Sequence, residues 1–144
     1  MISIGIRGFD RSLPMALMRA REAVMRHFRP SLAEHDLTEQ QWRVLRALHG
    51  ADRAVSVGEL AERTYLLGPS LSRMLVSLDE RGLIARTSAP GDARRAGITI
   101  TAKGVGLVAE IAPRSESAYE DIDRRLGPGE LEQLYALLDK VARL

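Results

Sequence analysis

The chain has 144 residues, of which 45% are apolar and 28% charged, a composition typical of a folded domain and unlike that of disordered or collagen-like chains. Its length suits one domain, and its net charge of +2 does not by itself indicate a polyanionic partner. The sequence contains no cysteine, which excludes disulfides, thiolate metal sites and cysteine nucleophiles. It shows no secretion signal and no apolar run of membrane-spanning length, so we expect a cytoplasmic protein without a membrane partner.

The first predicted element is a long helix over residues 13–32. Its apolar side chains recur every three to four positions, as at Leu17, Val24 and Phe28, which is the spacing of one helix face. Pro30 stands near the expected end of this helix.

Two helix starts follow, and both carry the same capping pattern. Thr38 and Gln41 have the spacing of a capping box, which predicts a helix that ends at Gly50. Ser56 and Glu59 repeat the pattern and predict a second, shorter helix. In each pair we expect the second side chain to bond back to the cap residue.

A third helix and a hairpin come next. Gly68 and Pro69 suit the cap and the first position of a helix, and Gly82 suits its left-handed stop. Two short runs, residues 83–88 and 97–101, predict the strands of an antiparallel hairpin with a long tip. Two short helices followed by such a hairpin predict a winged helix-turn-helix.

The rest of the chain predicts two further helices, over residues 102–126 and 128–144, the first capped by Thr101. The fold class is therefore mainly α, in the order α-α-α-α-β-β-α-α, with the two strands as the wing. The helices at both chain ends carry more apolar surface than one small winged helix covers, so a second copy of the chain is the simplest cover. The alternative is that these helices pack on each other within one chain.

Residues 66–103 carry six basic side chains against three acidic ones. A helix fits the major groove of B-form DNA, and a hairpin beside it can reach the minor groove. We interpret Arg73 as a guanine-reading side chain. We interpret Arg94 and Arg95 as the basic tip of the wing, with Asp92 holding Arg94 in place. An ordinary exposed turn and a winged helix that binds only protein are the alternatives. The DNA-binding candidates are Ser56, Pro69, Ser70, Ser72, Arg73, Ser77, Asp92, Arg94 and Arg95.

The sequence resembles the MarR family of bacterial transcription regulators over nearly its whole length. This resemblance rests on the order of elements, on DARR at the hairpin tip, on ERGLI before its first strand and on ITITAKG after its second. One group within the family, the regulators of homoprotocatechuate (3,4-dihydroxyphenylacetate) degradation operons, is resembled by SLPMALMRAREAVMRHFRP, LTEQQWRVLRAL and LLGPSLSRML. Asp92 and Arg94 match the paired wing residues of the family.

The resemblance implies one domain over residues 1–144, with dimerisation helices at 12–36 and 102–144 and a winged-helix DNA-binding core at 37–101. It implies a homodimer that binds double-stranded DNA at a palindromic operator. It further implies repression that a small phenolic or aromatic acid, such as a hydroxyphenylacetate, relieves. A winged-helix protein that binds DNA or protein without a small-molecule effector is the alternative.

A candidate ligand site lies on the first helix. Arg21 falls close to the centre of its apolar face, where an unpaired charge is costly. A carboxylate ligand is one partner for this guanidinium, and an acidic side chain of the same protein or water is the other. Trp42 can stack on a ring, although a staple with Leu37 at its helix start also explains it. The ligand-binding candidates are Arg21, Met18, Met25, His27 and Trp42.

No motif of catalysis emerges from the sequence. His27, His35 and His49 lack metal-ligand spacing, and there is no glycine-rich phosphate loop or nucleophile elbow. We therefore predict that the protein is not an enzyme and has no catalytic residue, metal or cofactor.

Overall fold

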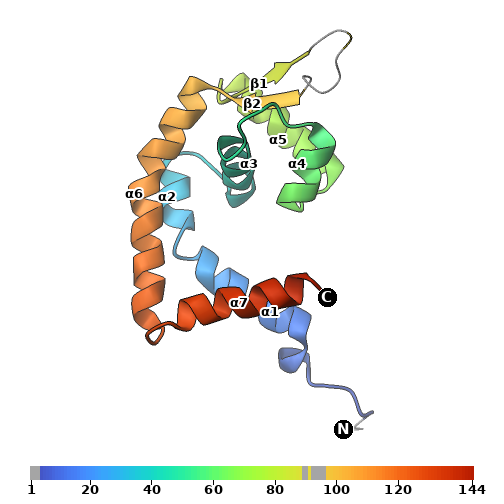
Figure 1. Cartoon of the computed structure of the whole chain (residues 1–144), viewed down its shortest axis with the longest axis vertical. Helices are drawn as coiled ribbons and strands as arrows, with labels where there is room; N and C mark the ends of the chain where they lie inside the picture. Colours follow the sequence, from blue (N-terminus) through green and yellow to red (C-terminus); the bar gives the residue numbers. More distant parts are fainter. Residues whose placement is uncertain (1–3, 89–90, 92–96) are drawn as a thin grey trace. The chain divides into compact units, whose positions relative to one another are not determined.

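The computed structural model describes residues 4–88, 91 and 97–144 (Figure 1). Within these ranges the chain forms seven α-helices, one short 3-10 helix and one two-stranded antiparallel sheet, which confirms the mainly α winged helix-turn-helix. The elements in chain order are η1 (Phe9–Arg11), α1 (Leu13–Met25), α2 (Arg29–Glu34), α3 (Glu39–His49), α4 (Val57–Thr64), α5 (Gly68–Glu80), β1 (Ile84–Thr87), β2 (Gly97–Ile100), α6 (Ala102–Arg125) and α7 (Glu130–Ala142).

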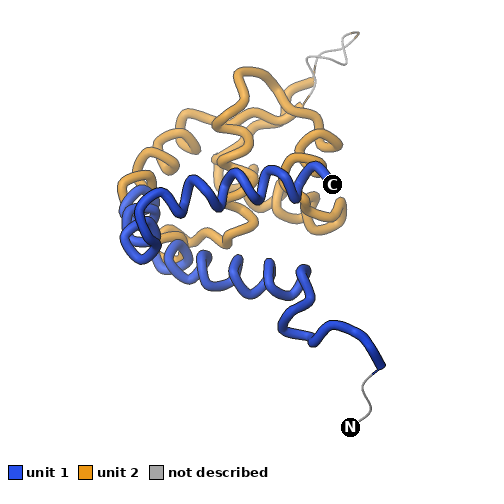
Figure 2. The backbone as a smooth tube through the Cα atoms, turned by 60° about the horizontal axis from the view of Figure 1, so that its bottom comes forward, with its two compact units in different colours: residues 1–30, 114–144 blue, residues 31–113 orange. Residues whose placement is uncertain are grey.

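The chain divides into two compact units (Figure 2). Unit 1 contains residues 1–30 and 114–144, and unit 2 contains residues 31–113. The winged helix, from α3 to β2, belongs entirely to unit 2. Among the described residues, none of the helices combines the length and the apolar character that crossing a membrane requires.

The prediction of one helix over residues 13–32 is wrong, because the chain turns between α1 and α2. The N–H groups of His27 and Phe28 donate to Val24 and Met25, three residues back, at 3.0 Å each. Pro30 explains the break, since it has no N–H to donate in a continuous helix and its ring collides with the carbonyl four residues earlier. It instead takes the second position of α2, where its lack of an N–H costs nothing.

The caps of α3 and α4 differ in one respect. At α3 the capping box is complete, because the Gln41 N–H donates to Thr38 Oγ1 at 3.1 Å and the Thr38 N–H donates to Gln41 Oε1 at 3.0 Å. At α4 the Glu59 N–H donates to Ser56 Oγ at 3.1 Å. The Glu59 carboxylate does not complete this second box as expected, because it accepts hydrogen bonds from Arg53 instead.

Helix α5 is bounded by residues with special backbone roles. Leu67 occupies the cap position, so α5 begins at Gly68, one residue earlier than predicted. At its other end Gly82 has φ +72° and donates to the Asp79 carbonyl at 2.9 Å. The Leu83 N–H donates to the Leu78 carbonyl at 3.0 Å, which completes a Schellman motif and confirms the expected left-handed stop.

The sheet joins the helix-turn-helix to the wing. Strands β1 and β2 pair antiparallel, from Ile84 opposite Ile100 to Thr87 opposite Gly97. Strand β2 also pairs with the segment before α4, because Val55 and Ile98 exchange two main-chain hydrogen bonds of 2.9 and 2.8 Å. The same residues enter one core of unit 2, whose fully buried members include Val44, Leu45, Val55, Leu60, Leu71, Leu75, Leu78, Ile84 and Ile98.

The start of α6 packs closely on this sheet. The Gly104 N–H donates to Thr101 Oγ1 at 3.1 Å, as the predicted cap requires, and the Thr101 hydroxyl donates to the Gly82 carbonyl at 2.6 Å. A Cβ at Gly104 would lie 2.3 Å from the main-chain oxygen of Leu83 and 2.6 Å from a side-chain carbon of Ile100. Glycine at this position therefore lets the helix approach the wing.

Candidate nucleic-acid interface

Helix α5 separates a buried face from an exposed one. Leu71, Leu75 and Leu78 are fully buried and anchor the helix in the core of unit 2. The opposite face exposes Pro69, Ser72, Arg73 and Val76, at the three-to-four spacing of one helix side. A helix anchored in this way presents its exposed stripe as a rigid unit, which reading the edges of base pairs requires.

The predicted serines of α5 do not all share this exposure. Ser72 is exposed, whereas Ser70 and Ser77 are half-buried. The guanidinium of Arg73 lies 3.5 Å from Ser70 Oγ, at the upper limit of a hydrogen bond, and is otherwise turned to the exposed side. Ser70 is thus placed to orient Arg73, and Ser72 is placed to reach a partner directly.

The amino end of α5 adds residues that the sequence interpretation missed. Leu67 at the cap is 78% exposed, and Tyr65 in the preceding turn is 90% exposed with a left-handed φ of 57°. Within the described part of the chain, no side chain accepts from the first N–H groups of α5. These donors are therefore open to an anion such as a phosphate.

The start of α4 lies beside the sheet and carries Ser56, another predicted DNA contact. Ser56 is exposed, and its hydroxyl already accepts from the Glu59 N–H. Arg53 donates to both oxygens of Glu59, at 2.6 and 2.9 Å. These hydrogen bonds hold the pKa of Glu59 below its ordinary value and raise the pKa of Arg53. The negative charge of this carboxylate, in the first turn of α4, is thereby balanced by the guanidinium of Arg53.

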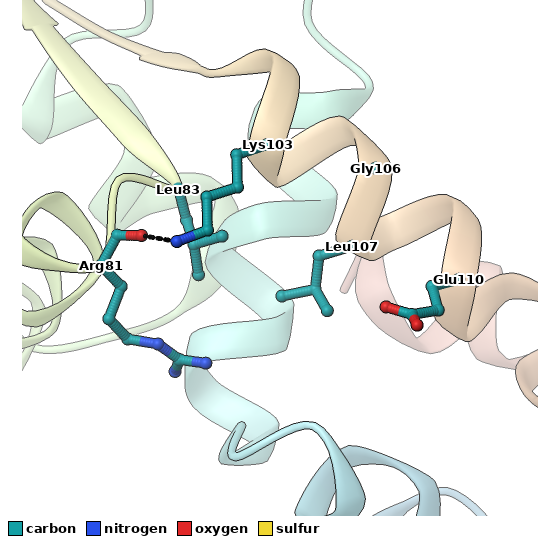
Figure 3. Close-up of a pocket in the computed structure, with 6 residues that line it drawn as sticks. All are labelled: Arg81, Leu83, Lys103, Gly106, Leu107 and Glu110. Atoms are coloured by element: carbon teal, nitrogen blue, oxygen red, sulfur yellow. Dashed lines mark hydrogen bonds between the residues drawn. The ribbon is translucent and has the colours of Figure 1, made fainter.

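The far end of α5 is attached at two points, of which Figure 3 shows the hydrogen bond between Lys103 and Arg81. Lys103 Nζ donates to the Arg81 carbonyl at 2.7 Å, while the Arg81 guanidinium extends away from it and donates to the carbonyls of Asp36 and His35 at 2.8 and 3.2 Å. These contacts satisfy carbonyls at the ends of α5 and α2. Beside them lies an open cavity of about 310 Å³, lined by Arg81, Leu83, Lys103, Gly106, Leu107 and Glu110.

The described part of the wing is its base. The hydroxyl of Thr87 donates to the Gly97 carbonyl at 3.1 Å, where the two strands end, and Arg86 adds an exposed cation to β1. The predicted tip residues Asp92, Arg94 and Arg95 lie outside the described residues.

Four of the five predicted ligand residues belong to unit 1, and Trp42 belongs to unit 2. Met18 is 62% exposed, Arg21 is exposed, and Met25 and His27 are half-buried. His27 Nδ1 lies 3.4 Å from Asp121 Oδ2. Trp42 packs against the core, with the guanidinium carbon of Arg46 5.9 Å from its ring centre. None of the five lines the cavity beside α5.

Unit 1 leaves much of its apolar surface exposed. Every residue of α1 and α7 is at least partly exposed in the single chain, including the large apolar side chains Leu17, Val24, Leu134, Leu137 and Leu138. The α1–α2 turn does contact α6, where the rings of Phe28 and Tyr119 meet edge to face at 5.0 Å. Burial, with the nearby Tyr119 and Glu132, raises the pKa of Tyr135 on α7.

Comparisons with known proteins agree with this geometry. A model of the MarR family matches residues 35–95. The chain is 36% identical over 133 residues to the homoprotocatechuate degradative operon repressor of Escherichia coli, covering 92% of this chain and 89% of that protein. The chain belongs to the MarR family. The expected family resemblance is thus confirmed, and this MarR-family protein is a transcriptional regulator and not an enzyme.

Three further proteins are similar to this chain over comparable lengths. The transcriptional regulator FarR of Neisseria gonorrhoeae is 34% identical, with 92% of this chain and 90% of FarR covered. The structure of the transcriptional regulator PA4135 matches with a TM-score of 0.86 and 38% identity, over 92% of this chain and 97% of that one. NadR in complex with 4-hydroxyphenylacetate matches with a TM-score of 0.80 and 33% identity, over 98% and 99%.

Proposed function

We propose that this MarR-family regulator is a cytoplasmic repressor that binds a palindromic operator as a homodimer and is released by a hydroxylated aromatic acid. The observation that carries the DNA-binding part is the exposed stripe of α5, in which Arg73 and Ser72 stand opposite three fully buried leucines. Such a helix suits the major groove, and an Arg there can donate two hydrogen bonds to one guanine.

The remaining DNA-binding candidates have supporting roles in this proposal. Ser56, Pro69 and Ser70 lie at helix starts, where main-chain and hydroxyl groups suit phosphates. Ser77 lies one turn beyond Arg73 on a half-buried side of α5. We keep Arg94 and Arg95 as the wing residues that enter the minor groove, with Asp92 pairing to Arg94.

The homodimer is supported by the exposed apolar side chains of α1 and α7. A second copy is the occupant that a palindromic site requires, because two-fold symmetry places one recognition helix on each half-site. We therefore propose that residues 12–36 and 102–144 form the dimer interface and that residues 37–101 form the DNA-binding core, within one domain over 1–144.

The effector is inferred from relatives. NadR is described with 4-hydroxyphenylacetate bound, and the DNA binding of Bordetella bronchiseptica BpsR, 26% identical to this chain, is regulated by 6-hydroxynicotinic acid. Both ligands combine a ring, a hydroxyl group and a carboxylate. We propose an acid of this class, with Arg21 on its carboxylate and with Met18, Met25 and His27 near its ring. Trp42, which belongs to unit 2, is a separate candidate for stacking on an aromatic ring.

The effector acts by differential binding in this proposal. An acid that binds only a dimer whose two α5 helices are wrongly spaced for the operator shifts the population away from the form that binds DNA. To release a repressor that is mostly bound to its operator, the acid must bind the form that cannot bind DNA more favourably than the other form by about 3 to 5 kcal/mol.

The test is a titration of the protein with a fluorescent duplex of its own upstream region, with and without each acid. We expect tight, salt-dependent binding that 4-hydroxyphenylacetate or 3,4-dihydroxyphenylacetate weakens and that phenylethylamine, which lacks the carboxylate, leaves unchanged. Binding that no acid alters would favour an effector-independent DNA-binding protein. Binding without salt dependence, or no binding, would favour a protein-interaction module.

A further inference from the structure

Val76 is an apolar side chain in the exposed stripe of α5, and contacts with the polar edges of bases do not account for it. Val76 is 52% exposed, although the helix buries three leucines completely on its other face. At about 100° per residue, Val76 lies between Ser72 and Arg73 when the helix is viewed along its axis, and therefore at the centre of the stripe.

The distance along the helix sets what Val76 can reach. A rise of about 1.5 Å per residue places Val76 about 5 Å beyond Ser72 and Arg73, farther than the spacing of about 3.4 Å between base pairs. If Arg73 donates to the base of one pair, Val76 therefore faces the adjacent base pair or the pair after that. A hydroxyl or amide at this place would read a polar edge, but valine presents only methyl groups.

The major groove has one apolar group that matches such a side chain, the C5 methyl group of thymine. Valine in a helix is held close to a single rotamer, so its two methyl groups are already oriented before DNA binds. The contact therefore costs little side-chain entropy on binding.

We propose that Val76 reads a thymine, by packing its methyl groups on the C5 methyl group of that base in each half-site. The inference rests on the proposed entry of α5 into the major groove. It adds a base preference of a different kind from that of Arg73, because the contact is apolar and independent of salt.

The experiment begins with duplexes that the wild-type protein selects from a random-sequence library. Each thymine of the selected duplex is then replaced, one at a time, by deoxyuridine, which pairs identically and lacks only the methyl group. We expect one thymine in each half-site at which the wild-type protein loses about fourfold in affinity, as the burial of one methyl group predicts. Val76→Ala should bind the unmodified duplex more weakly and lose nothing further at that uracil.

Two further variants keep the test specific. Val76→Ile retains a branched apolar side chain and should keep the uracil sensitivity. Val105→Ala removes a valine of similar exposure, 41%, from α6, outside the exposed stripe of α5, and should keep the uracil sensitivity of the wild type. Because the side chain of Val76 is exposed, we expect the Val76 variants and the wild type to have equal thermal midpoints, which would show that folding is unchanged.

The outcomes separate this inference from the proposed function. A selection that enriches no duplex overturns both. A selected duplex that the wild type binds equally with thymine or uracil at every position overturns only the thymine contact. Uracil sensitivity that persists unchanged in Val76→Ala also overturns it, because another side chain would then read the methyl group.

Discussion

Arg53 donates two hydrogen bonds to the carboxylate of Glu59, at 2.6 and 2.9 Å, and so joins the loop after α3 to the first turn of α4. Between these two residues lies Val55, whose main chain pairs with Ile98 of the wing. The ion pair thus joins the two ends of the short segment between α3 and α4 that pairs with β2. Its contribution is expected to depend on pH, because it requires an ionised carboxylate.

We expect Glu59→Gln to flatten the loss of stability at low pH. The pKa of Glu59 is lowered in the folded chain by the hydrogen bonds from Arg53, so its stabilising effect is complete above its ordinary value of 4.5 and is lost as pH falls through the lower, folded value. Urea unfolding of wild type and variant from about pH 3 to about pH 7 measures the free energy of unfolding over the range in which a carboxyl group titrates. Parallel curves over the acidic range would show that the pair does not contribute.

We expect Gly104→Ala to lower the free energy of unfolding by about 1 to 3 kcal/mol, since its Cβ would meet the Leu83 carbonyl and Ile100. Gly106→Ala is the matched control in the same helix, because a Cβ there meets nothing within 4 Å. The control should gain about 0.5 to 1 kcal/mol, the usual gain of alanine over glycine in a helix. Denaturant titration compares the two, and equal effects would contradict the close approach of α6 to the wing.

We expect Arg73→Ala to lose about 1 to 3 kcal/mol of discrimination at one base position in each half-site. Arg73→Lys is the informative control, because lysine keeps the charge and lacks the planar fork that binds guanine at two points. Affinities for a selected duplex and for its single-base variants measure both. Unchanged base preference in Arg73→Ala would remove this residue from the reading surface.

We expect Arg94→Ala to weaken binding to all duplexes by a similar factor. It should also reduce the slope of log affinity against log salt by about one for each phosphate contact that is lost. Arg143→Ala, at the end of α7, removes the same charge outside unit 2 and should leave the slope unchanged. A wild-type slope in Arg94→Ala would contradict the assigned role of the wing.

We expect Arg21→Ala to raise the concentration of aromatic acid needed for half-release from DNA by tenfold or more, with unchanged affinity for DNA when no acid is present. The expectation follows from the loss of a charge-assisted pair with the carboxylate. Arg19→Ala is the control, because Arg19 lies on the same helix and donates to the Asp10 carbonyl at 3.3 Å. An unaltered acid response in Arg21→Ala would remove Arg21 from the effector site.

Local signals in the sequence predicted most of the secondary structure correctly. The capping box of Thr38 and Gln41, the cap at Ser56 and the left-handed stop at Gly82 all appear as expected. Each depends on groups within five residues of one another, so neighbouring residue types suffice to identify it. The helix break at Pro30 was also encoded locally, but apolar periodicity continued across it and concealed the turn.

The sequence by itself therefore determined the order of the elements from α3 to α7, their ends to within about two residues, and the family to which the chain belongs. Only the tertiary structure decided which partners the charged side chains take. It paired Glu59 with Arg53 rather than with its own helix start, placed His27 beside Asp121, and directed Arg81 to carbonyls 45 and 46 residues away. It also showed that Val76 stands at the centre of an exposed stripe. Such partners depend on which segments the hydrophobic core brings together, and that arrangement leaves no pattern among neighbouring residues.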